Sequence, residues 1–374
     1  MKLVVDRVMV DAAEAFAPYG EVRLVDGRSL TATELTDADV LLVRSVTRVN
    51  RELLHDSPVR FVGTATAGTD HIDLRYLDSR NIAFASAPGC NARAVGEYVL
   101  ACVLAFAAQS GRSPSDLRVG IIGCGHAGTA AQGLLEAIGV MCLRHDPPRA
   151  AREGEGGFVD FERVLHADVV SLHVPLITDG AHPTRGLLDA KALAAMPAGS
   201  LLINAARGGI VDEQALCAAL DAGKLYAVID CWAGEPQINL PLLDRAWVAT
   251  PHIAGHSVDA RRRATVQIRD ALARWLGVAA APAEWVSAPA AMLALGTAEP
   301  LRALQAAVFH CCDPQTLTGV VKGLEAAALG AEFDRLRARF GTRREFLAQP
   351  VTLPQGDPDT ARLLQSVGFP VSIA

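Results

Sequence analysis

The sequence predicts an α/β fold with two Rossmann-like or flavodoxin-like parallel-sheet domains, followed by a small C-terminal α+β domain. Three observations support this fold class. Short apolar runs alternate with segments of helical length, a glycine-rich fingerprint starts at Gly123, and the segment Ala279–Pro289 is rich in Ala and Pro. Such alternation is typical of parallel sheets covered by helices, and 374 residues are enough for two or three domains.

The first parallel sheet is predicted from apolar runs near the N-terminus. These runs are Leu3–Val5, Val40–Val43, Phe61–Gly63 and Ile82–Phe84. A helix from about Ala92 to Ala108, with Asn91 as its N-cap, is expected to connect this sheet to the next one. Its apolar stretch is shorter than the roughly 18 to 20 residues that cross a bilayer, so no membrane span is predicted.

A second series of apolar runs predicts the second parallel sheet. These runs are Val119–Ile122, Val169–Leu172, Leu201–Ile203, Tyr226–Ile229 and Trp247–Ala249. A helix over about Asp259–Trp275 is expected next, and the Ala- and Pro-rich segment after it indicates a linker. The rest of the chain mixes helical pattern with a loop rich in Pro, Gly and Asp.

The composition argues against several classes of partner. The chain has 35 basic and 41 acidic residues, a net charge of −6 and no run of five like charges. Neither a nucleic acid nor a membrane surface is therefore an expected partner. The eight cysteines show no Cys-x-x-Cys spacing, so no metal site is predicted and reduced thiols of a cytoplasmic protein are expected. An acidic residue, Asp6, comes too early for a signal peptide.

The glycine-rich segment predicts a dinucleotide site. Gly123, Gly125 and Gly128 have the Gly-x-Gly-x-x-Gly spacing, directly after an apolar run and at the start of an expected helix. The first glycine permits the turn, the second lets the backbone approach a pyrophosphate, and the third lets helix and strand pack closely. His126 and Ala127 begin the helix, where backbone N–H groups favour phosphate.

An aspartate at the expected distance suggests which dinucleotide binds. Asp146 follows Gly128 by 18 residues, at the end of the next apolar run. A carboxylate there accepts hydrogen bonds from ribose hydroxyls and repels a 2′-phosphate, which favours NAD over NADP. The nearby Arg144 and Arg149 weigh in the other direction, because they could attract that phosphate.

Three further residues follow predicted strands and carry useful chemistry. They are Arg207, Glu235 and His252. Ligands of open α/β sheets bind at the carboxyl ends of the strands, so these side chains are expected to meet. An arginine binds a carboxylate through two hydrogen bonds, a histidine exchanges a proton near neutral pH, and a carboxylate orients that histidine. The set suits oxidation of an alcohol beside a nicotinamide, although each residue alone has an ordinary surface role.

Four segments resemble the D-isomer-specific 2-hydroxyacid dehydrogenases. They are Val119–Gly128, Asn204–Asp212, Asp230–Pro236 and Pro251–Gly255. The resemblance implies an NAD-dependent enzyme with Arg207, Glu235 and His252 as catalytic residues. It implies substrate contacts at Ser45 and Thr66. The implied NAD contacts outside the fingerprint are Asp146, Val174, Ala205, Ala206, Arg207, Asp230 and Gly255.

Two positions depart from the family pattern. Val174 stands where a threonine is common, which leaves only a backbone contact to the cofactor. His256 stands in place of a tyrosine that helps to bind substrate. The resemblance also divides the chain. Residues 1–92 and 256–280 are expected to bind substrate, 93–255 to form the NAD-binding Rossmann domain, and 281–374 to form the C-terminal domain.

Within this family, the segments Arg44–Asn50, Phe61–His71 and Ala87–Ala92 resemble a branch that acts on a small phosphorylated hydroxy acid. The tail around Glu332–Arg337 resembles the extra C-terminal dimerisation domain of that branch, which implies a homodimer. Arg44 and Arg48 are the candidate phosphate ligands. Two alternatives stay open: a dehydrogenase of phosphoglycerate or another D-2-hydroxy acid, and a non-catalytic NAD-sensing protein.

Overall fold

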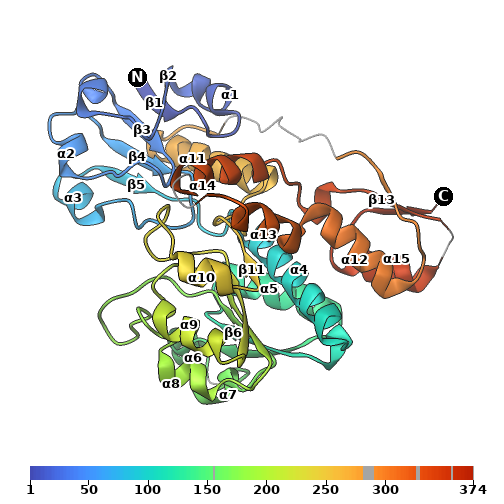
Figure 1. The fold of residues 1–374 in the computed structure, drawn as a ribbon. Coiled ribbons are helices and arrows are strands. Elements are labelled where there is room, and N and C mark those ends of the chain that lie inside the picture. The colour runs from blue at the N-terminus through green and yellow to red at the C-terminus, as the bar shows by residue number, and fades with distance from the viewer. Residues whose placement is uncertain (155, 281–289, 326–328, 355–356, 374) are drawn as a thin grey trace. The chain divides into compact units, whose positions relative to one another are not determined.

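The computed structural model describes residues 1–154, 156–280, 290–325, 329–354 and 357–373. It divides into two compact units. The first comprises Met1–Asn91 and Val258–Ser287, and the second comprises Ala92–Ser257 and Ala288–Ala374. The predicted α/β class with parallel sheets is confirmed (Figure 1). Most of the expected linker at Ala279–Pro289 lies outside the described residues.

The first unit is built on a five-stranded parallel sheet with strand order β2-β1-β3-β4-β5, the order of flavodoxin-like folds. The strands are β1 (Lys2–Asp6), β2 (Glu21–Val25), β3 (Val40–Val43), β4 (Phe61–Thr64) and β5 (Ala83–Ala85). The sequence did not predict β2. This edge strand buries only Val25, so it has no apolar run that could identify it.

Both faces of this sheet are buried, as is usual for parallel sheets. Leu3 and Val5 join one hydrophobic cluster, whereas Val4 between them joins the cluster on the opposite face. The short helices are α1 (Ala12–Phe16), α2 (Arg51–Leu54) and α3 (Leu74–Ser79), with 3-10 turns η1 (Ala17–Tyr19) and η2 (Ala32–Leu35). The long helix α11 (Val258–Leu276) completes the unit, and its Ile268 packs closely on Gly63 of β4.

The second unit holds a six-stranded parallel sheet with strand order β11-β10-β9-β8-β6-β7. The strands are β6 (Arg118–Ile122), β7 (Met141–His145), β8 (Val169–Leu172), β9 (Ser200–Asn204), β10 (Leu225–Ile229) and β11 (Val248–Ala249). The chain forms β7 on one side of β6 and then crosses to β8 on the other side. The carboxyl ends of β6 and β8 therefore flank the point where strand order reverses, which is where such sheets bind ligands.

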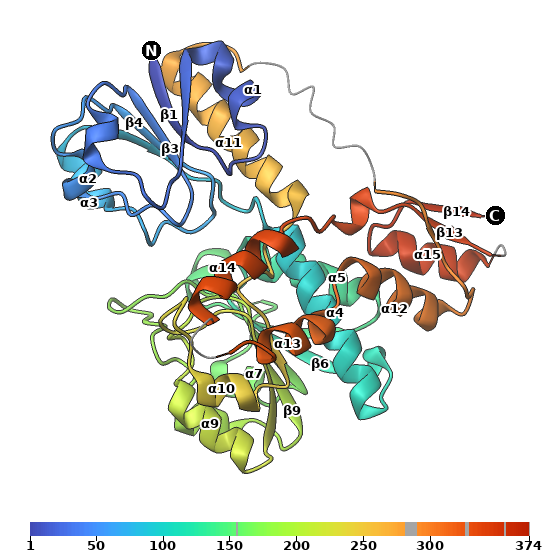
Figure 2. The same cartoon turned by 45° about the horizontal axis from the view of Figure 1, so that its top comes forward.

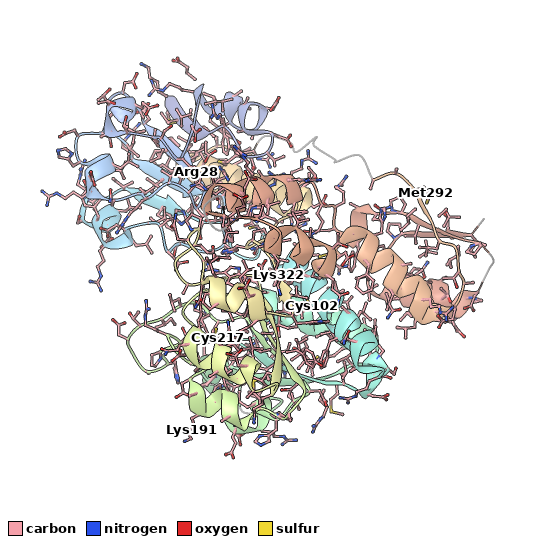
Figure 3. All side chains as sticks on the ribbon, in the orientation of Figure 1. Arg28, Cys102, Lys191, Cys217, Met292 and Lys322 are labelled. Carbon is pink, nitrogen blue, oxygen red and sulfur yellow. The ribbon has the colours of Figure 1, made fainter. Side chains whose placement is uncertain are left out.

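The helix α4 (Ala92–Ser110) lies in the interior of the second unit, and its residues from Ala94 to Ala107 are buried. Cys102 on α4 is fully buried, whereas Lys191 on α8 (Ala190–Ala195) lies at the surface (Figure 3). In the described part of the chain, α4 is the one helix long and apolar enough to cross a membrane, and 78% of its apolar window is buried. The other elements are η3 (Pro114–Asp116), α5 (His126–Ala137), α6 (Pro147–Glu153), α7 (Phe161–Leu165), α8 (Ala190–Ala195), α9 (Glu213–Asp221) and α10 (Leu240–Arg245).

The C-terminal region adds helices and a small parallel sheet with strand order β12-β13-β14. Its elements are β12 (Leu293–Ala294), α12 (Pro300–Cys311), α13 (Pro314–Lys322), α14 (Leu329–Phe340), η4 (Phe346–Ala348), β13 (Val351–Leu353), α15 (Pro358–Ser366) and β14 (Val371–Ile373). The helices α12 and α15 lie side by side (Figures 1 and 2).

The sequence predicts a C-terminal domain from residue 281, and the described part of this region contributes residues to the same hydrophobic clusters as the second sheet. Phe333 on α14 belongs to the cluster of β8 to β10, and Phe369 belongs to the cluster of α4. On α13, Thr318 Oγ1 accepts a 3.0 Å hydrogen bond from Ala249 N–H at the sheet edge. Lys322 donates to the carbonyl of Ala246 at 2.6 Å. Apolar contacts and side-chain hydrogen bonds from α13 therefore join the region to the second unit.

Candidate active site

The glycine-rich loop between β6 and α5 has the geometry that a dinucleotide site requires. Gly123 has a φ of 90°, and a Cβ on Gly128 would lie 2.0 Å from the carbonyl oxygen of Gly123. Only glycine fits these two positions without strain. Around Gly125, in contrast, no atom lies within 4 Å of an added Cβ, and no side chain caps α5 there. The open space at the start of this helix fits a pyrophosphate bound by backbone N–H groups, including those of His126 and Ala127.

Asp146 lies beside this loop, directly after β7. Its Oδ2 accepts a 2.8 Å hydrogen bond from Cys124 N–H, and its Oδ1 accepts a 2.9 Å bond from Arg149 N–H at the start of α6. A carboxylate has about four acceptor positions, so these two bonds leave others for ribose hydroxyls. The structure thus connects the fingerprint to the acidic residue that the sequence placed eighteen positions later.

The two arginines near Asp146 already have partners. Arg144 donates to the carbonyl of Gly157 at 2.8 Å and lies over the ring of Phe158, 4.7 Å from its centroid. Arg149 pairs with Glu153 at 2.8 Å and also contacts the carbonyl of Cys124. These contacts occupy the cations that could otherwise recognise a 2′-phosphate.

The other predicted cofactor contacts lie at the carboxyl ends of the same sheet. Val174 follows β8, and its Cγ1 would lie 2.7 Å from a Cβ on Gly123, so it borders the glycine-rich loop. Ala205, Ala206 and Arg207 directly follow β9. Gly255 is half-buried in the segment after β11.

Asn204 at the end of β9 supports the position of Arg207. Its Nδ2 donates to the carbonyl of Arg207 at 3.0 Å and to the carbonyl of Cys231 at 3.2 Å. The Arg207 guanidinium donates to the carbonyl of Ala206 at 2.8 Å. The sequence analysis did not assign a role to Asn204, although a polar residue that ends a buried apolar run was a usable signal.

Glu235 and His252 form a direct hydrogen bond, 2.7 Å between Oε2 and Nδ1. The other carboxylate oxygen, Oε1, accepts a 2.7 Å bond from Trp232 N–H. With its proton on Nδ1, the imidazole keeps Nε2 as the atom that can accept a proton. Burial raises the pKa of Glu235, but His252 and the hydrogen bonds to the carboxylate outweigh burial and leave the pKa below its ordinary value.

Asp230 holds the segment that carries His252, which we call the catalytic loop (residues 250–257). Its Oδ1 accepts bonds from Thr250 Oγ1 at 2.6 Å and Ile253 N–H at 2.7 Å, and its Oδ2 accepts from Ala254 N–H at 3.0 Å. The backbone of His252 has a φ of 53°, a left-handed conformation that costs about 1 to 2 kcal/mol. Asp230 is fully buried, and these bonds stabilise the strained loop. Its predicted contact with NAD stays a prediction.

One cluster in the described part of the chain has the donor atoms of a metal site. A sulfur of Cys231, a carboxylate oxygen of Glu235 and a nitrogen of His252 lie within 4.8 Å of one another. Glu235 and His252 are already bonded to each other, and burial raises the pKa of the Cys231 thiol well above its ordinary value. Because a metal ligand must be a thiolate, this chemistry favours the hydrogen-bonded pair over a metal site.

The predicted substrate contacts of the first unit lie at the carboxyl ends of β3 and β4, which pair with each other. Ser45 is exposed two residues after β3. Thr66 is half-buried two residues after β4, and its Oγ1 bonds to Thr64 Oγ1 at 2.9 Å.

The two candidate phosphate ligands lie in different surroundings. Arg44 pairs with the buried Asp6 at 3.1 Å. Arg48 is exposed and lines a surface pocket of which neither Arg44 nor Ser45 is part. The pocket is lined by Arg48, Asn50, Arg51, Glu52, His55 and Asp73.

A further cation, Arg261, was missed by the sequence analysis. It lies in the first turn of α11. Two neighbouring arginines fix the position of this turn: Arg262 donates a 2.7 Å hydrogen bond to Asp11, and Arg263 donates a 2.9 Å hydrogen bond to the carbonyl of Cys90. These partners follow β1 and β5, so the turn lies at the carboxyl edge of the first sheet. Burial lowers the pKa of Arg261, and the positive charge of Arg44 lowers it further. The signal for this residue was the run of three arginines at 261–263.

Comparison with known proteins agrees with this geometry. Residues 103–254 match the family described as D-isomer specific 2-hydroxyacid dehydrogenase, NAD binding domain. The chain is 41% identical to erythronate-4-phosphate dehydrogenase of Escherichia fergusonii over 99% of this chain and 98% of that protein. It is 41% identical to the Pseudomonas aeruginosa protein of the same name, over 98% of this chain and 99% of the relative.

Solved structures show the same fold over about three quarters of the chain. The TT0316 protein from Thermus thermophilus has a TM-score of 0.64 and 27% identity, and covers 75% of this chain and 98% of its own. The NAD-bound 3-phosphoglycerate dehydrogenase of Entamoeba histolytica has a TM-score of 0.64 and 23% identity, and covers 76% of this chain and 99% of its own.

Proposed function

The chain belongs to the erythronate-4-phosphate dehydrogenase family, and from that membership we propose that it oxidises C2 of 4-phospho-D-erythronate to give 2-oxo-3-hydroxy-4-phosphobutanoate. It is an NAD-dependent oxidoreductase of the D-2-hydroxyacid dehydrogenase type. The observation that carries the proposal is the 2.7 Å pair of Glu235 and His252, which follows β10 and β11 of the same parallel sheet whose β6 leads into the dinucleotide-type loop. Through the resemblance we also propose a role in pyridoxal 5′-phosphate (vitamin B6) biosynthesis, a homodimer and a cytoplasmic location.

The residues of the second unit divide the chemistry between them. His252 Nε2 removes the proton of the C2 hydroxyl, and Glu235 stabilises the imidazolium that forms. Arg207 binds the substrate carboxylate and the C2 oxygen, where negative charge develops. Bound NAD⁺ supplies the acceptor for the hydride that leaves C2, and the loop of Gly123–Gly128 with Asp146 would hold it.

A substrate panel tests the proposed function. The enzyme is incubated with NAD⁺ and 4-phospho-D-erythronate, 3-phosphoglycerate or D-lactate, and the absorbance of reduced nicotinamide is followed. We expect the highest kcat/KM with 4-phospho-D-erythronate. Preference for either other acid would replace the substrate and keep the reaction class, whereas no reduction with any acid would support an NAD-sensing protein.

We predict that Asp146→Ala lowers the preference for NAD⁺ over NADP⁺ by about 10- to 100-fold. The reason is the loss of charge-assisted hydrogen bonds to ribose, worth about 1.5 to 3 kcal/mol, together with the loss of repulsion against a 2′-phosphate. The ratio of kcat/KM with the two cofactors measures the effect. Asp160→Ala is the matched control, because Asp160 caps α7 at Arg163 N–H in the same way. Equal ratios in both variants would contradict the role of Asp146.

We predict that Arg261→Gln and Arg44→Gln raise the KM for 4-phospho-D-erythronate by about 10- to 100-fold and change the KM for D-erythronate much less. Each guanidinium is proposed to donate charge-assisted hydrogen bonds to the phosphate, and buried bonds of this kind are the strong ones. Arg48→Gln is the control, since Arg48 lines a surface pocket of which neither Arg44 nor Arg261 is part. Should Arg48→Gln alone raise the KM for the phosphorylated substrate, the phosphate would bind at that pocket instead.

A further inference from the structure

The C-terminal region directly contacts the catalytic loop. Arg343 donates from Nη2 to the carbonyl of Ala254 at 3.1 Å and from Nε to the carbonyl of His256 at 3.4 Å. Ser257 Oγ donates to Glu345 Oε1 at 2.8 Å. The Arg343 side chain is 8% exposed, and Glu345 and Ser257 are buried. All of these residues belong to the second unit, so the contacts lie within one compact body.

A buried carboxylate on α4 fixes the arginine that makes these contacts. Glu97 is fully buried and accepts from Arg343 Nη1 at 3.1 Å, from Arg93 Nε at 2.8 Å and from Phe346 N–H at 2.9 Å. Arg343 Nη2 also donates to the carbonyl of Ala94 at 2.9 Å. Burial raises the pKa of Glu97 to about 7, although both guanidinium groups lower it. One planar guanidinium thus joins two acceptors on α4 to two carbonyls of the catalytic loop.

The catalytic loop is therefore held from two sides. Asp230 binds its first half at Thr250, Ile253 and Ala254, as described above. Arg343 and Glu345 bind its second half, from Ala254 to Ser257, which includes Gly255 and His256. Those two residues are the predicted cofactor and substrate contacts of the loop.

We propose that Arg343 is a positioning residue for the oxidation. It holds the carbonyls of Ala254 and His256 so that Gly255 and His256 meet their ligands and His252 stays aligned with C2 of the substrate. The C-terminal region thereby takes part in the reaction without touching the reacting atoms. This inference rests on the proposed function for the identity of the substrate, and on the contacts alone for the placement of the loop.

The test compares Arg343→Lys with Arg93→Lys. Arg93 also pairs with Glu97, contacts the carbonyl of Val367 and lies 5.7 Å from the ring centroid of Phe346, so it joins the same region to α4. These partners of Arg93 all lie outside the catalytic loop. A lysine keeps the positive charge beside Glu97 in both variants, but one ammonium cannot serve four acceptors that a planar guanidinium reaches. Both variants thus replace an arginine that pairs with Glu97. Only Arg343→Lys also removes hydrogen bonds to the carbonyls of the catalytic loop.

We expect Arg343→Lys to lower kcat/KM for 4-phospho-D-erythronate by about 10- to 100-fold, the size of loss caused by a misplacement of about 1 Å. The kcat/KM of Arg93→Lys should stay within about twofold of the wild-type value. The Tm should fall by a similar amount in both variants. Equal kcat/KM in the two folded variants would overturn the proposal, because both would then act only on stability.

A second measurement separates this proposal from the proposed function. The Kd for NAD⁺ by calorimetry needs no turnover, and it should rise several-fold in Arg343→Lys and not in Arg93→Lys. If the wild type oxidises none of the acids, the proposed function fails while this comparison still tests the loop. If Arg343→Lys does not fold, Ser257→Ala replaces it, with an expected three- to tenfold loss of kcat/KM, roughly the effect of one hydrogen bond. Wild-type kinetics in Ser257→Ala would then overturn the proposal.

Discussion

Replacing His252 by alanine should lower kcat by at least about 10²- to 10⁴-fold, the usual contribution of a general base. The reason is that His252 Nε2 is the proposed proton acceptor for the C2 hydroxyl. The Kd for NAD⁺ should change little, because the glycine-rich loop and Asp146 make the main predicted contacts. Steady-state rates with 4-phospho-D-erythronate and calorimetry with NAD⁺ measure the two quantities.

The left-handed backbone of His252 requires a second variant as a control. Alanine at a φ of 53° adds strain that has no relation to proton transfer. Asparagine tolerates this conformation and cannot act as a base at neutral pH. His252→Asn should therefore be as slow as His252→Ala. A rate near that of the wild type in His252→Asn would remove His252 from the proton transfer.

Glu235→Gln should lower kcat by about 10²- to 10⁴-fold, as expected when the orienting carboxylate of a catalytic histidine becomes an amide. The glutamine side chain has nearly the same shape as the glutamate that it replaces. Trp232 N–H requires an acceptor at Oε1, so the amide oxygen is expected to take that place. The amide nitrogen then faces His252 Nδ1 and donates to it. This puts the imidazole proton on Nε2, which can no longer accept a proton from the substrate.

Glu213→Gln is the matched control for this change. Glu213 Oε1 accepts a 2.8 Å hydrogen bond from Ala233 N–H, next to the bond that Glu235 receives. This carboxylate bonds to Ala233 and not to His252, so its conversion to an amide should leave kcat within about twofold. A kcat that falls equally in both variants would show that the loop, and not the histidine tautomer, is responsible.

Much of the candidate site follows from local sequence patterns. Gly123, Gly125 and Gly128 identify the loop because their spacing is set by one turn and the start of one helix. Arg207, Glu235 and His252 could be grouped before the structure was known, since each follows a buried apolar run. The carboxyl ends of parallel strands share an edge, so the sequence predicts that these three distant positions lie near one another, and the structure pairs two of them, Glu235 and His252.

Other features depend on contacts between distant parts of the chain. The edge strand β2 buries one residue and has no pattern to detect. The position of Arg261 could not be predicted, because the first turn of its helix is held by hydrogen bonds to Asp11 after β1 and to Cys90 after β5. Arg343 lies 246 residues from Glu97, and its role appears only when both are buried together.

The apolar runs along the chain thus determined the parallel sheets and the three residues proposed for catalysis, and the spacing of the glycines determined the dinucleotide loop. Tertiary structure alone decided that Asp230 supports the catalytic loop, that Arg48 lines a pocket of which Arg44 is not part and that the C-terminal region binds the loop through Arg343. The physical reason is one of range. Turns, caps and strand ends are set by neighbours in sequence, whereas a buried ion pair depends on which distant side chains lose water together.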